Sequence, residues 1–446
     1  MIVQKLIMRN FRRYEDACFS FHHRFNVLIG NNGRGKTTIL DALAIMLNTY
    51  LLHSKIATGG TGIKNNDARF VVRNVSGQVF FEPQSDVWLK TSADIDRKTI
   101  EWQRELRDRG GKAKELVKLG EQAIKALKNG DKPNLPLLLY YGTGRLWESH
   151  RNKQVDNQKS QLDAYRYCLD PKSDQNAFEK WFRRLSYSEL LKEKDKKIPA
   201  LEALREAVVC CTPGASRYYY DPAREQIMIE LAHEGLMPFN NLSDGFRNMI
   251  AMVSDIAHRA SKLNPHLAEN AARETKGIVL IDELDLHLHP KWQRRVALDL
   301  QKAFPNLQFI TTTHSPFIIQ SLEPGQVIDL EQGTSCDCTY SAESGVASPK
   351  PGAEFSNRSI EDITEDIMGI AIPQRSERYQ KMYEVAKEYY KVLQKAQEAD
   401  ESEIERLKQK LDELSAPFSD NVAYYAFLEM ERVAAGLGKS SKKGEN

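Results

Sequence analysis

The chain has 446 residues, of which 63 are lysine or arginine and 61 are aspartate or glutamate, so its net charge is only +2. Its 41% hydrophobic and 28% charged content is typical of a globular protein with a large core, and at roughly 150 residues per domain the length predicts two to three domains. This balance argues against the whole chain being a strong nucleic-acid binder, although it leaves room for a local basic patch.

The six cysteines do not form a zinc-ligand pattern, which predicts reduced thiols in a cytoplasmic protein. The opening residues, MIVQKLIMRNFRRYEDACFSF, alternate in polarity and predict a strand rather than a signal peptide. A run of about 18 apolar residues, which a membrane span needs, is absent. We therefore expect no membrane partner.

Residues 25–47, FNVLIGNNGRGKTTILDALAIML, predict a phosphate-binding loop. A short apolar run at 25–29 stops at glycine, as in a buried strand, and a helix is predicted from Thr38 onward. Between them lies the pattern G-x-x-x-x-G-K-[ST], whose glycines let backbone N–H groups approach phosphates beside a helix N-terminus. A tight turn with an incidental lysine is the structural alternative. The residues expected to bind nucleotide are Gly30, Asn31, Asn32, Gly33, Arg34, Gly35, Lys36, Thr37 and Thr38.

Two residues of this loop have separate predicted tasks. Lys36 is placed to reach the β- and γ-phosphates, and Thr37 offers a hydroxyl to Mg²⁺.

The middle of the chain predicts helical insertions around one strand. Residues 101–130 are charged and predict a helical insertion interrupted at Gly110 and Gly111. Residues 137–141 are apolar and predict a strand. Residues 151–212 predict further helices, including an amphipathic one around Phe178, Trp181, Phe182 and Leu185.

The stretch NNLSDGFRNMIAMVSDIAHRA places Ser243 and Gly245 at the start of a predicted amphipathic helix. A helix N-terminus attracts anions, so both residues are candidates for phosphate binding. An N-cap serine followed by a glycine turn explains the same pattern without a ligand.

Two further strands carry polar residues at their ends. Residues 278–281 are four consecutive apolar residues, as in a central parallel strand, and they end in Asp282 and Glu283. At the carboxyl edge of such a sheet, Asp282 can hold Mg²⁺ and Glu283 can polarise a water aimed at the γ-phosphate. A solvated acid pair is the alternative. The next predicted strand, residues 307–311, is followed by His314, which can bond a phosphate oxygen at the same edge.

The C-terminal part has a different composition. Residues 346–373 predict a polar linker, residues 374–436 a helical extension, and residues 437–446 a disordered tail. The extension has narrow apolar stripes on charged helices, and Asp420 is placed to cap the last of them. These helices either pack back on their own head or present a surface to a partner.

The order of these motifs resembles that of the ABC-type ATPase heads of the SMC/RecF-like group, in the AAA family, which also begin with a strand that carries an Asn-Phe-Arg stretch, here residues 10–12. The resemblance implies an α/β fold, with a mixed N-terminal β-lobe and a parallel-sheet, RecA-like core spanning residues 1–345. It implies that residues 30–37 are the Walker A loop and that Asp282 and Glu283 are the Walker B pair with the catalytic glutamate.

The same resemblance implies roles for the other motifs. Residues 242–245 look like the signature, residues 284–290 like the D-loop and His314 like the switch histidine. The glutamine loop of this group has no clear equivalent: after the strand at 137–141 the sequence offers Arg145, and Gln84 is the other candidate. In this group the signature serine of one protomer closes on ATP held by another. Ser243 would then donate to the γ-phosphate of ATP across the interface of a homodimer or larger even-numbered oligomer, while Thr37 and Asp282 of the copy that holds the ATP would bind Mg²⁺.

The compact head, the YYGTGRLW stretch and the helical tail look most like the PtuA ATPase subunits of Septu antiphage systems, including retron-associated forms. That resemblance implies ATP hydrolysis that controls an HNH-type nuclease bound through the tail. A RecF-like repair ATPase that clamps DNA directly is the alternative, so nucleic acid stays a candidate partner. A third reading is an ATPase in which ATP serves mainly as a structural ligand.

Overall fold

The computed structural model describes residues 1–54, 56–75, 78–106, 111–144, 160–171, 175–191, 197–232, 234–330, 359–368, 377–399, 401–419 and 421–437. The chain divides into two compact units, Met1–Met368 and Gly369–Asn446, and each has a hydrophobic core of its own.

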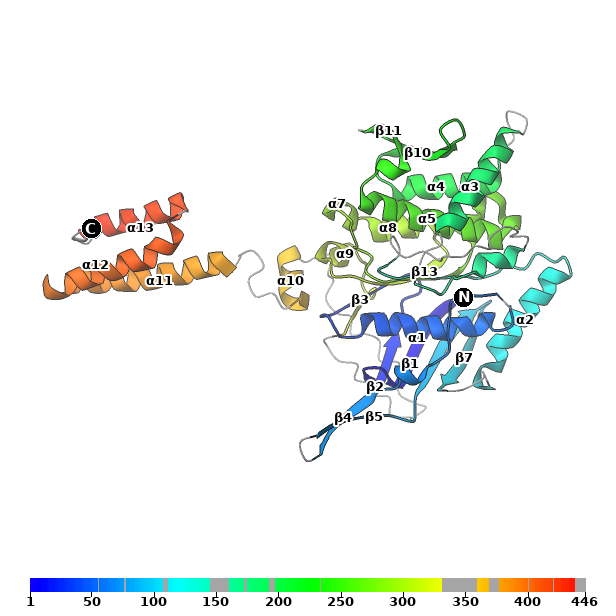
Figure 1. The fold of residues 1–446 in the computed structure, drawn as a ribbon, viewed down its shortest axis with the longest axis horizontal. Helices are drawn as coiled ribbons and strands as arrows, with labels where there is room; N and C mark the ends of the chain where they lie inside the picture. The colour runs from blue at the N-terminus through cyan, green and yellow to red at the C-terminus, as the bar shows by residue number, and fades with distance from the viewer. Residues whose placement is uncertain are drawn as a thin grey trace. The chain divides into compact units, whose positions relative to one another are not determined.

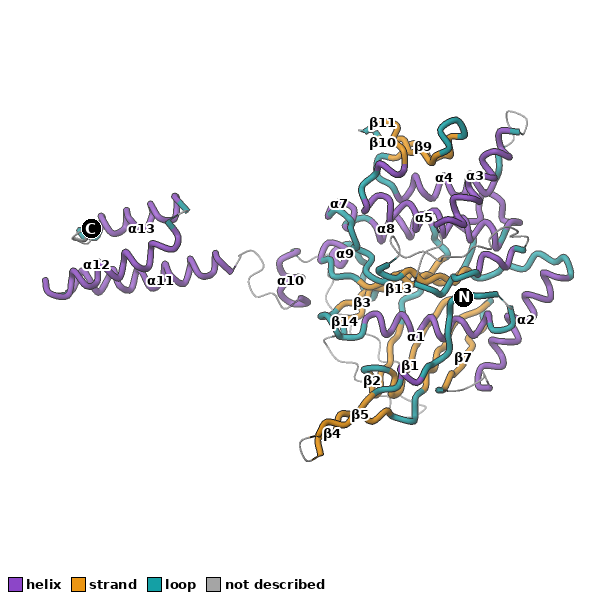
Figure 2. The backbone as a smooth tube through the Cα atoms, in the orientation of Figure 1, coloured by secondary structure: helices purple, strands orange, loops and turns teal. Residues whose placement is uncertain are grey.

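A five-stranded parallel sheet forms the centre of the first unit (Figure 2). Its strand order is β14-β3-β13-β12-β8, so neighbours in space are distant in sequence. Every residue of the four longer strands β3, β8, β12 and β13 is buried, because helices or the second lobe cover both faces. The strands are β3 (Phe25–Ile29), β8 (Leu137–Tyr141), β12 (Gly277–Ile281), β13 (Leu307–Thr312) and β14 (Val327–Asp329).

An antiparallel lobe lies on one side of this sheet, with helix α1 (Lys36–Asn48) between them (Figure 1). Ten of the thirteen α1 residues are buried, which explains its nearly continuous apolar sequence. The lobe is a four-stranded sheet in the order β2-β1-β6-β7, formed by β1 (Ile2–Phe11), β2 (Tyr14–Ser20), β6 (Trp88–Ile95) and β7 (Lys98–Glu105). The predicted fold class, a mixed N-terminal lobe on a parallel core, is confirmed.

The predicted helix at residues 101–130 is wrong at its start. Residues 101–105 belong to strand β7, which pairs with β6 through a tight turn at Asp96 and Arg97. Ile100, Trp102 and Arg104 are buried while their neighbours are more exposed, so the charges on alternate residues mark the outer face of a strand. A helix follows only at α2 (Lys114–Lys128).

Helices and a small sheet cover the other face of the parallel sheet (Figure 1). The longest helix of the first unit, α5 (Asp244–Leu263), packs against α4 (Pro199–Cys211) and against β8. A three-stranded antiparallel sheet in the order β11-β10-β9 precedes α5 in the chain. The remaining elements of this side are α3 (Gln175–Leu190), β9 (Ala215–Asp221), β10 (Gln226–Leu231), β11 (Gly235–Pro238), α6 (Ala271–Glu274), α7 (Pro290–Gln293), α8 (Val296–Ala303) and α9 (Pro316–Gln320).

The linker predicted at residues 346–373 is wrong over its second half. Helix α10 (Ile360–Met368) lies there, packs against α9 and buries Ile363 in the core of the head. The second unit contains α11 (Glu377–Glu398), α12 (Glu401–Ser415) and α13 (Val422–Ala434). Asn421 caps α13, and the predicted cap Asp420 lies outside the described residues, as do residues 438–446. In the described part of the chain, no helix is both long and apolar enough to span a bilayer.

Candidate nucleotide-binding site

The phosphate loop joins β3 to α1 and is closed on itself by its lysine. The Lys36 ammonium donates to the carbonyl oxygen of Gly30 at 2.6 Å and to that of Asn31 at 3.2 Å. Residues 31–34 are exposed. The loop therefore holds a buried cation against its own carbonyls and leaves its outer surface open to a ligand.

Glycine is required where the loop meets the β-lobe. Gly35 has φ of 90°, and a Cβ there would lie 2.6 Å from Cδ of Arg13 and 2.8 Å from the Tyr14 hydroxyl. That hydroxyl donates to the Arg34 carbonyl at 2.8 Å, and burial raises the pKa of Tyr14 to about 12, so it stays a neutral donor. Helix α1 begins at Lys36, two residues earlier than predicted, because the loop turns directly into it.

The first turn of α1 meets the end of β12 through one hydrogen bond. The Thr37 hydroxyl donates to Oδ2 of Asp282 at 2.9 Å, and the Thr312 hydroxyl donates to Oδ1 at 2.6 Å. Asp282 is only 6% exposed. A hydroxyl and a carboxylate held together are oxygen ligands of the kind that Mg²⁺ prefers, and Mg²⁺ usually takes its other ligands from water and phosphate. The residues present therefore fit a magnesium ion.

Glu283 follows in a strained conformation. Its φ is 50°, which costs a residue with a side chain roughly 1–2 kcal/mol. Its N–H donates to the Thr312 hydroxyl at 2.7 Å, and the N–H of Leu284 donates to the Thr312 carbonyl at 2.8 Å. Thr312 thus fixes both acidic residues, a role that the sequence analysis missed although the residue stands in the run TTTH.

His314 is held at the same edge of the sheet. Its N–H donates to Oδ1 of Asp285 at 3.2 Å, and the Thr313 hydroxyl donates to the same oxygen at 2.5 Å. The His314 side chain is exposed. Asp285 thereby connects the segment after β12 to the segment after β13, and the sequence analysis had not singled it out.

The predicted signature residues lie at the start of α5. Gly245 packs so closely on the segment after β12 that a Cβ would lie 2.2 Å from the carbonyl oxygen of His287. Packing within this chain therefore explains Gly245. Ser243 is exposed and its side chain does not cap the helix, so capping does not explain the serine. Within the described residues, no hydrogen bond joins Ser243 to the phosphate loop.

Neither candidate for the glutamine loop is placed at the site by the described contacts. Arg145 lies outside the described residues, and Gln84 donates its N–H to the Arg69 carbonyl at the base of the paired strands β4 (Phe70–Val75) and β5 (Gln78–Pro83). Instead, the Tyr140 hydroxyl of β8 donates to Oδ1 of Asp41 on α1 at 2.9 Å. Burial raises the pKa of Tyr140 well above its ordinary value, so this donor stays protonated.

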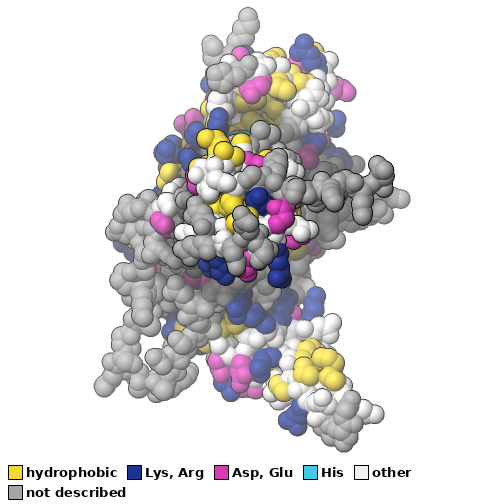
Figure 3. All heavy atoms as spheres, turned by 90° about the vertical axis from the view of Figure 1, so that its left-hand side faces the viewer, with side chains coloured by type: hydrophobic (Ala, Val, Ile, Leu, Met, Phe, Trp, Pro, Cys, Tyr) yellow, Lys and Arg dark blue, Asp and Glu magenta, His cyan; other side chains and the backbone are white. Residues whose placement is uncertain are grey.

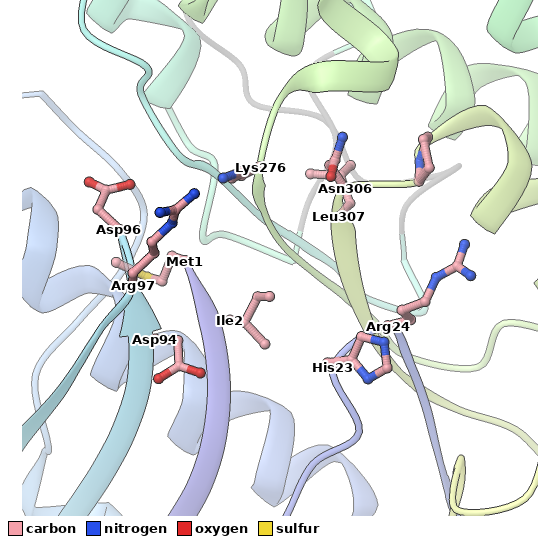
Figure 4. Close-up of a pocket in the computed structure, with 11 residues that line it drawn as sticks. Met1, Ile2, His23, Arg24, Asp94, Asp96, Arg97, Lys276, Asn306 and Leu307 are labelled. Atoms are coloured by element: carbon pink, nitrogen blue, oxygen red, sulfur yellow. The ribbon is translucent and has the colours of Figure 1, made fainter.

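A separate pocket of about 540 Å³ lies at the opposite edge of the sheet, where β12 and β13 begin (Figure 4). Its lining mixes Arg97 and Lys276 with Asp94 and Asp96. Burial lowers the pKa of the Met1 amino group there. Nucleotides bind beyond the carboxyl ends of parallel strands, so this pocket does not compete with the loop as the nucleotide site.

A glycine loop entering a buried helix, with a threonine–aspartate pair at the carboxyl edge of a parallel sheet, defines a P-loop ATPase. The chain belongs to the family described as "AAA domain, putative AbiEii toxin, Type IV TA system", whose model matches residues 25–320. It is an ATPase of that family.

The chain is also similar to individual proteins of retron and Septu systems. The chain is 26% identical to the retron Vc95 probable ATPase of Vibrio cholerae over 72% of this chain and 73% of the relative. It is 26% identical to the retron Ec83 probable ATPase of Escherichia coli over 74% and 72%, respectively. A Septu protein PtuA of Bacillus mycoides is 42% identical over 20% of this chain and 11% of its own length. The resemblance drawn from the motifs is therefore confirmed.

Among solved structures, the SMC head domain from Thermotoga maritima covers 73% of this chain and 93% of its own, with 14% identity and a TM-score of 0.42. An SMC head bound to the C-winged helix domain of ScpA covers 74% and 93%, with 17% identity and a TM-score of 0.41.

Proposed function

We propose that this chain is the ATP-hydrolysing regulatory subunit of a bacterial antiphage defence complex. Two copies close on ATP, and this closure controls a partner nuclease of the HNH type. The contact between Thr37 and Asp282 carries the nucleotide part of the proposal, because it joins the phosphate loop to the carboxylate at the end of β12. The names of the retron and Septu relatives support the defence part.

The residues of the site divide the work. The amides of the loop and Lys36 hold the phosphates, and the hydroxyl of Thr37 and the carboxylate of Asp282 hold Mg²⁺, which neutralises phosphate charge when bound. Glu283 takes a proton from the attacking water as general base. His314 bonds the γ-phosphate and loses that bond after hydrolysis. The Thr312 hydroxyl, which bonds the Asp282 carboxylate and the Glu283 N–H, keeps the two residues in place for these separate tasks.

The exposed Ser243 supports closure by a second copy. Ser243 is the N-cap residue of the 20-residue helix α5, so its hydroxyl and the following N–H groups can donate to an anion. In the described part of the chain, Ser243 makes no hydrogen bond with the phosphate loop of its own copy. We therefore assign its phosphate contact to ATP held by a sister subunit, so that ATP binding favours association.

The C-terminal unit offers a surface for the nuclease. Its core is formed by the inner faces of α11, α12 and α13, and Arg432 is buried there with Asp412 at 2.6 Å. On the outer face of α13, Phe427, Met430 and Val433 are 52–71% exposed at a spacing of three residues. An apolar stripe of this kind is the pattern of a helix that docks into a groove.

Substitution of Met430 by glutamate tests this assignment. Placing a charge at the centre of the stripe is expected to weaken binding to the proposed HNH-type partner nuclease at least tenfold, because the charge would be desolvated in the complex. ATP binding should not change. The measurement is surface plasmon resonance with purified nuclease, and Gln409→Glu on the exposed side of α12 adds the same charge as a matched control. Equal nuclease affinity for wild type, Met430→Glu and a Met1–Met368 fragment would refute a docking tail.

A further inference from the structure

A two-stranded ribbon projects from the β-lobe (Figure 1). It is formed by β4 (Phe70–Val75) and β5 (Gln78–Pro83), which pair only with each other among the described strands. Val72 lies opposite Phe81, and Phe70 lies opposite Pro83. Because side chains alternate along a strand, the residues that share one face of the ribbon are Phe70, Val72, Asn74, Val79, Phe81 and Pro83.

This face is apolar and uncovered. Phe70, Val72, Val79 and Phe81 are 47–66% exposed, and hydrophobic side chains are visible at the lower end of the molecule in Figure 3. The opposite face carries the ion pair between Arg73 and Glu82. A two-stranded ribbon is marginally stable alone in water, and a contiguous apolar patch of this kind marks an interaction site.

The base of the ribbon is tied to the helix that follows the phosphate loop. Arg12 donates from Nε to Asp67 at 2.9 Å, three residues before β4, and also bonds Asp41 on α1. The N–H of Arg69 donates to the Asn10 carbonyl at 2.8 Å. The ribbon is therefore anchored, through Arg12, to the helix that begins at the phosphate loop.

The strand that precedes the signature residues 242–245 lies on the side of the parallel sheet away from the ribbon. Strand β11 is an edge strand of its three-stranded sheet. It precedes Ser243 in the chain, with residues 239–242 between them. Leu236 of β11 is 47% exposed, and Met237 beside it is partly buried. Figure 1 shows β9–β11 and the ribbon on opposite sides of the parallel sheet.

We propose that the apolar face of the ribbon docks on strand β11 of a second copy of this chain. The inference rests on the proposed function, in which each phosphate loop faces the sister's Ser243. In a two-fold dimer arranged in this way, the lobe that carries the ribbon in one copy would face the lobe that carries β11 in the other copy. The two ribbons would lie at opposite ends of the dimer. The contact between the ribbon and β11 would therefore occur twice in the dimer, each time on the strand that precedes the signature residues 242–245.

The size of the patch fits an auxiliary contact of this kind. On the order of 400 Å² of apolar surface is exposed on the ribbon face, about half of the ~800 Å² that one partner contributes to a standard interface. The ribbon is thus too small to hold a complex by itself. It is large enough to strengthen one that ATP also holds.

Two neighbouring residues of β5 provide a matched pair for the test. Phe81 lies on the apolar face and Phe80 on the opposite face, and both are exposed. In the Glu283→Gln background with ATP and Mg²⁺, Phe81→Ser should weaken self-association at least tenfold by sedimentation velocity, while Phe80→Ser leaves it unchanged. Leu236→Asp should reproduce the effect from the acceptor side. Titration with a fluorescent ATP analogue, at a protein concentration low enough that all proteins are monomeric, should give wild-type affinity for all three, which shows that the site is folded.

A photocrosslinker identifies the acceptor. With p-benzoyl-phenylalanine in place of Phe81, ATP-dependent crosslinks should reach residues 235–238 of the second copy, as read by mass spectrometry. Crosslinks to the sister ribbon, or equal association of the Phe81→Ser and reference proteins, would overturn the ribbon contact and leave ATP-driven closure intact. No ATP-driven association in the reference protein would overturn both proposals.

Discussion

Lys36→Ala is expected to abolish nucleotide binding. The lysine ammonium is buried within the loop and bonds two loop carbonyls, so its removal takes away the cation that faces the phosphates and the anchor that shapes the loop. Hydrogen bonds to a charged group are worth about 1.5–3 kcal/mol each, and Lys36 is expected to bond both the β- and the γ-phosphate, so the loss of these two bonds to ATP predicts at least ~100-fold weaker binding. Titration with a fluorescent ATP analogue measures it.

The control for this substitution is a lysine away from the loop. Lys98 lies on the surface of β7 and pairs with Glu115, so Lys98→Ala should leave the affinity unchanged. Thermal unfolding of both variants shows whether the fold survives. A well-folded Lys36→Ala protein with wild-type affinity would show that this loop is not the phosphate site.

Glu283→Gln is expected to stop turnover while ATP stays bound. The substitution keeps the size of the side chain and the backbone bond to Thr312, but an amide cannot accept the proton of the attacking water. Loss of a general base typically costs about 10²–10⁴-fold in rate. Phosphate release measures the rate, and the sedimentation coefficient should show ATP-bound assemblies that persist.

Glu274→Gln provides the matched control, because Glu274 is an exposed glutamate three residues before β12. Its rate should equal that of wild type. If wild type itself bound ATP without turnover and Glu283→Gln behaved identically, ATP would be a structural ligand and the hydrolytic role of Glu283 would be wrong.

The parts of the fold that were predictable from sequence carry strong local patterns. Strand β12 is a continuous apolar run and strands β3 and β13 are mostly apolar, because both of their faces are covered, and polar residues or glycine mark their ends. The phosphate loop is local as well, since its glycines, lysine and threonine are consecutive. Strand β7 was misread because its outward residues are charged and its inward residues include Arg104.

Contacts between residues that are far apart in the sequence have no local sequence pattern that predicts them. Thr312 bonds Asp282, and Tyr140 bonds Asp41 across 99 residues, but neither threonine nor tyrosine is distinctive in its own stretch. Helix α10 was read as linker because its flanking sequence is polar and, among its described side chains, only Ile363 reaches full burial. The ribbon had a weak signal, an apolar alternation around Ser76 and Gly77, which is typical of a hairpin.

Mixing two inactive variants tests the central claim, that ATP is enclosed by the loop of one copy and Ser243 of another. Lys36→Ala and Ser243→Arg should each lack ATPase activity alone. In a mixed dimer, the loop of the Ser243→Arg copy and the intact serine of the Lys36→Ala copy complete one site. An equimolar mixture should therefore recover about a quarter of wild-type activity, since half of the dimers are mixed and each has one intact site. A mixture as inactive as its components would contradict a site shared between two copies.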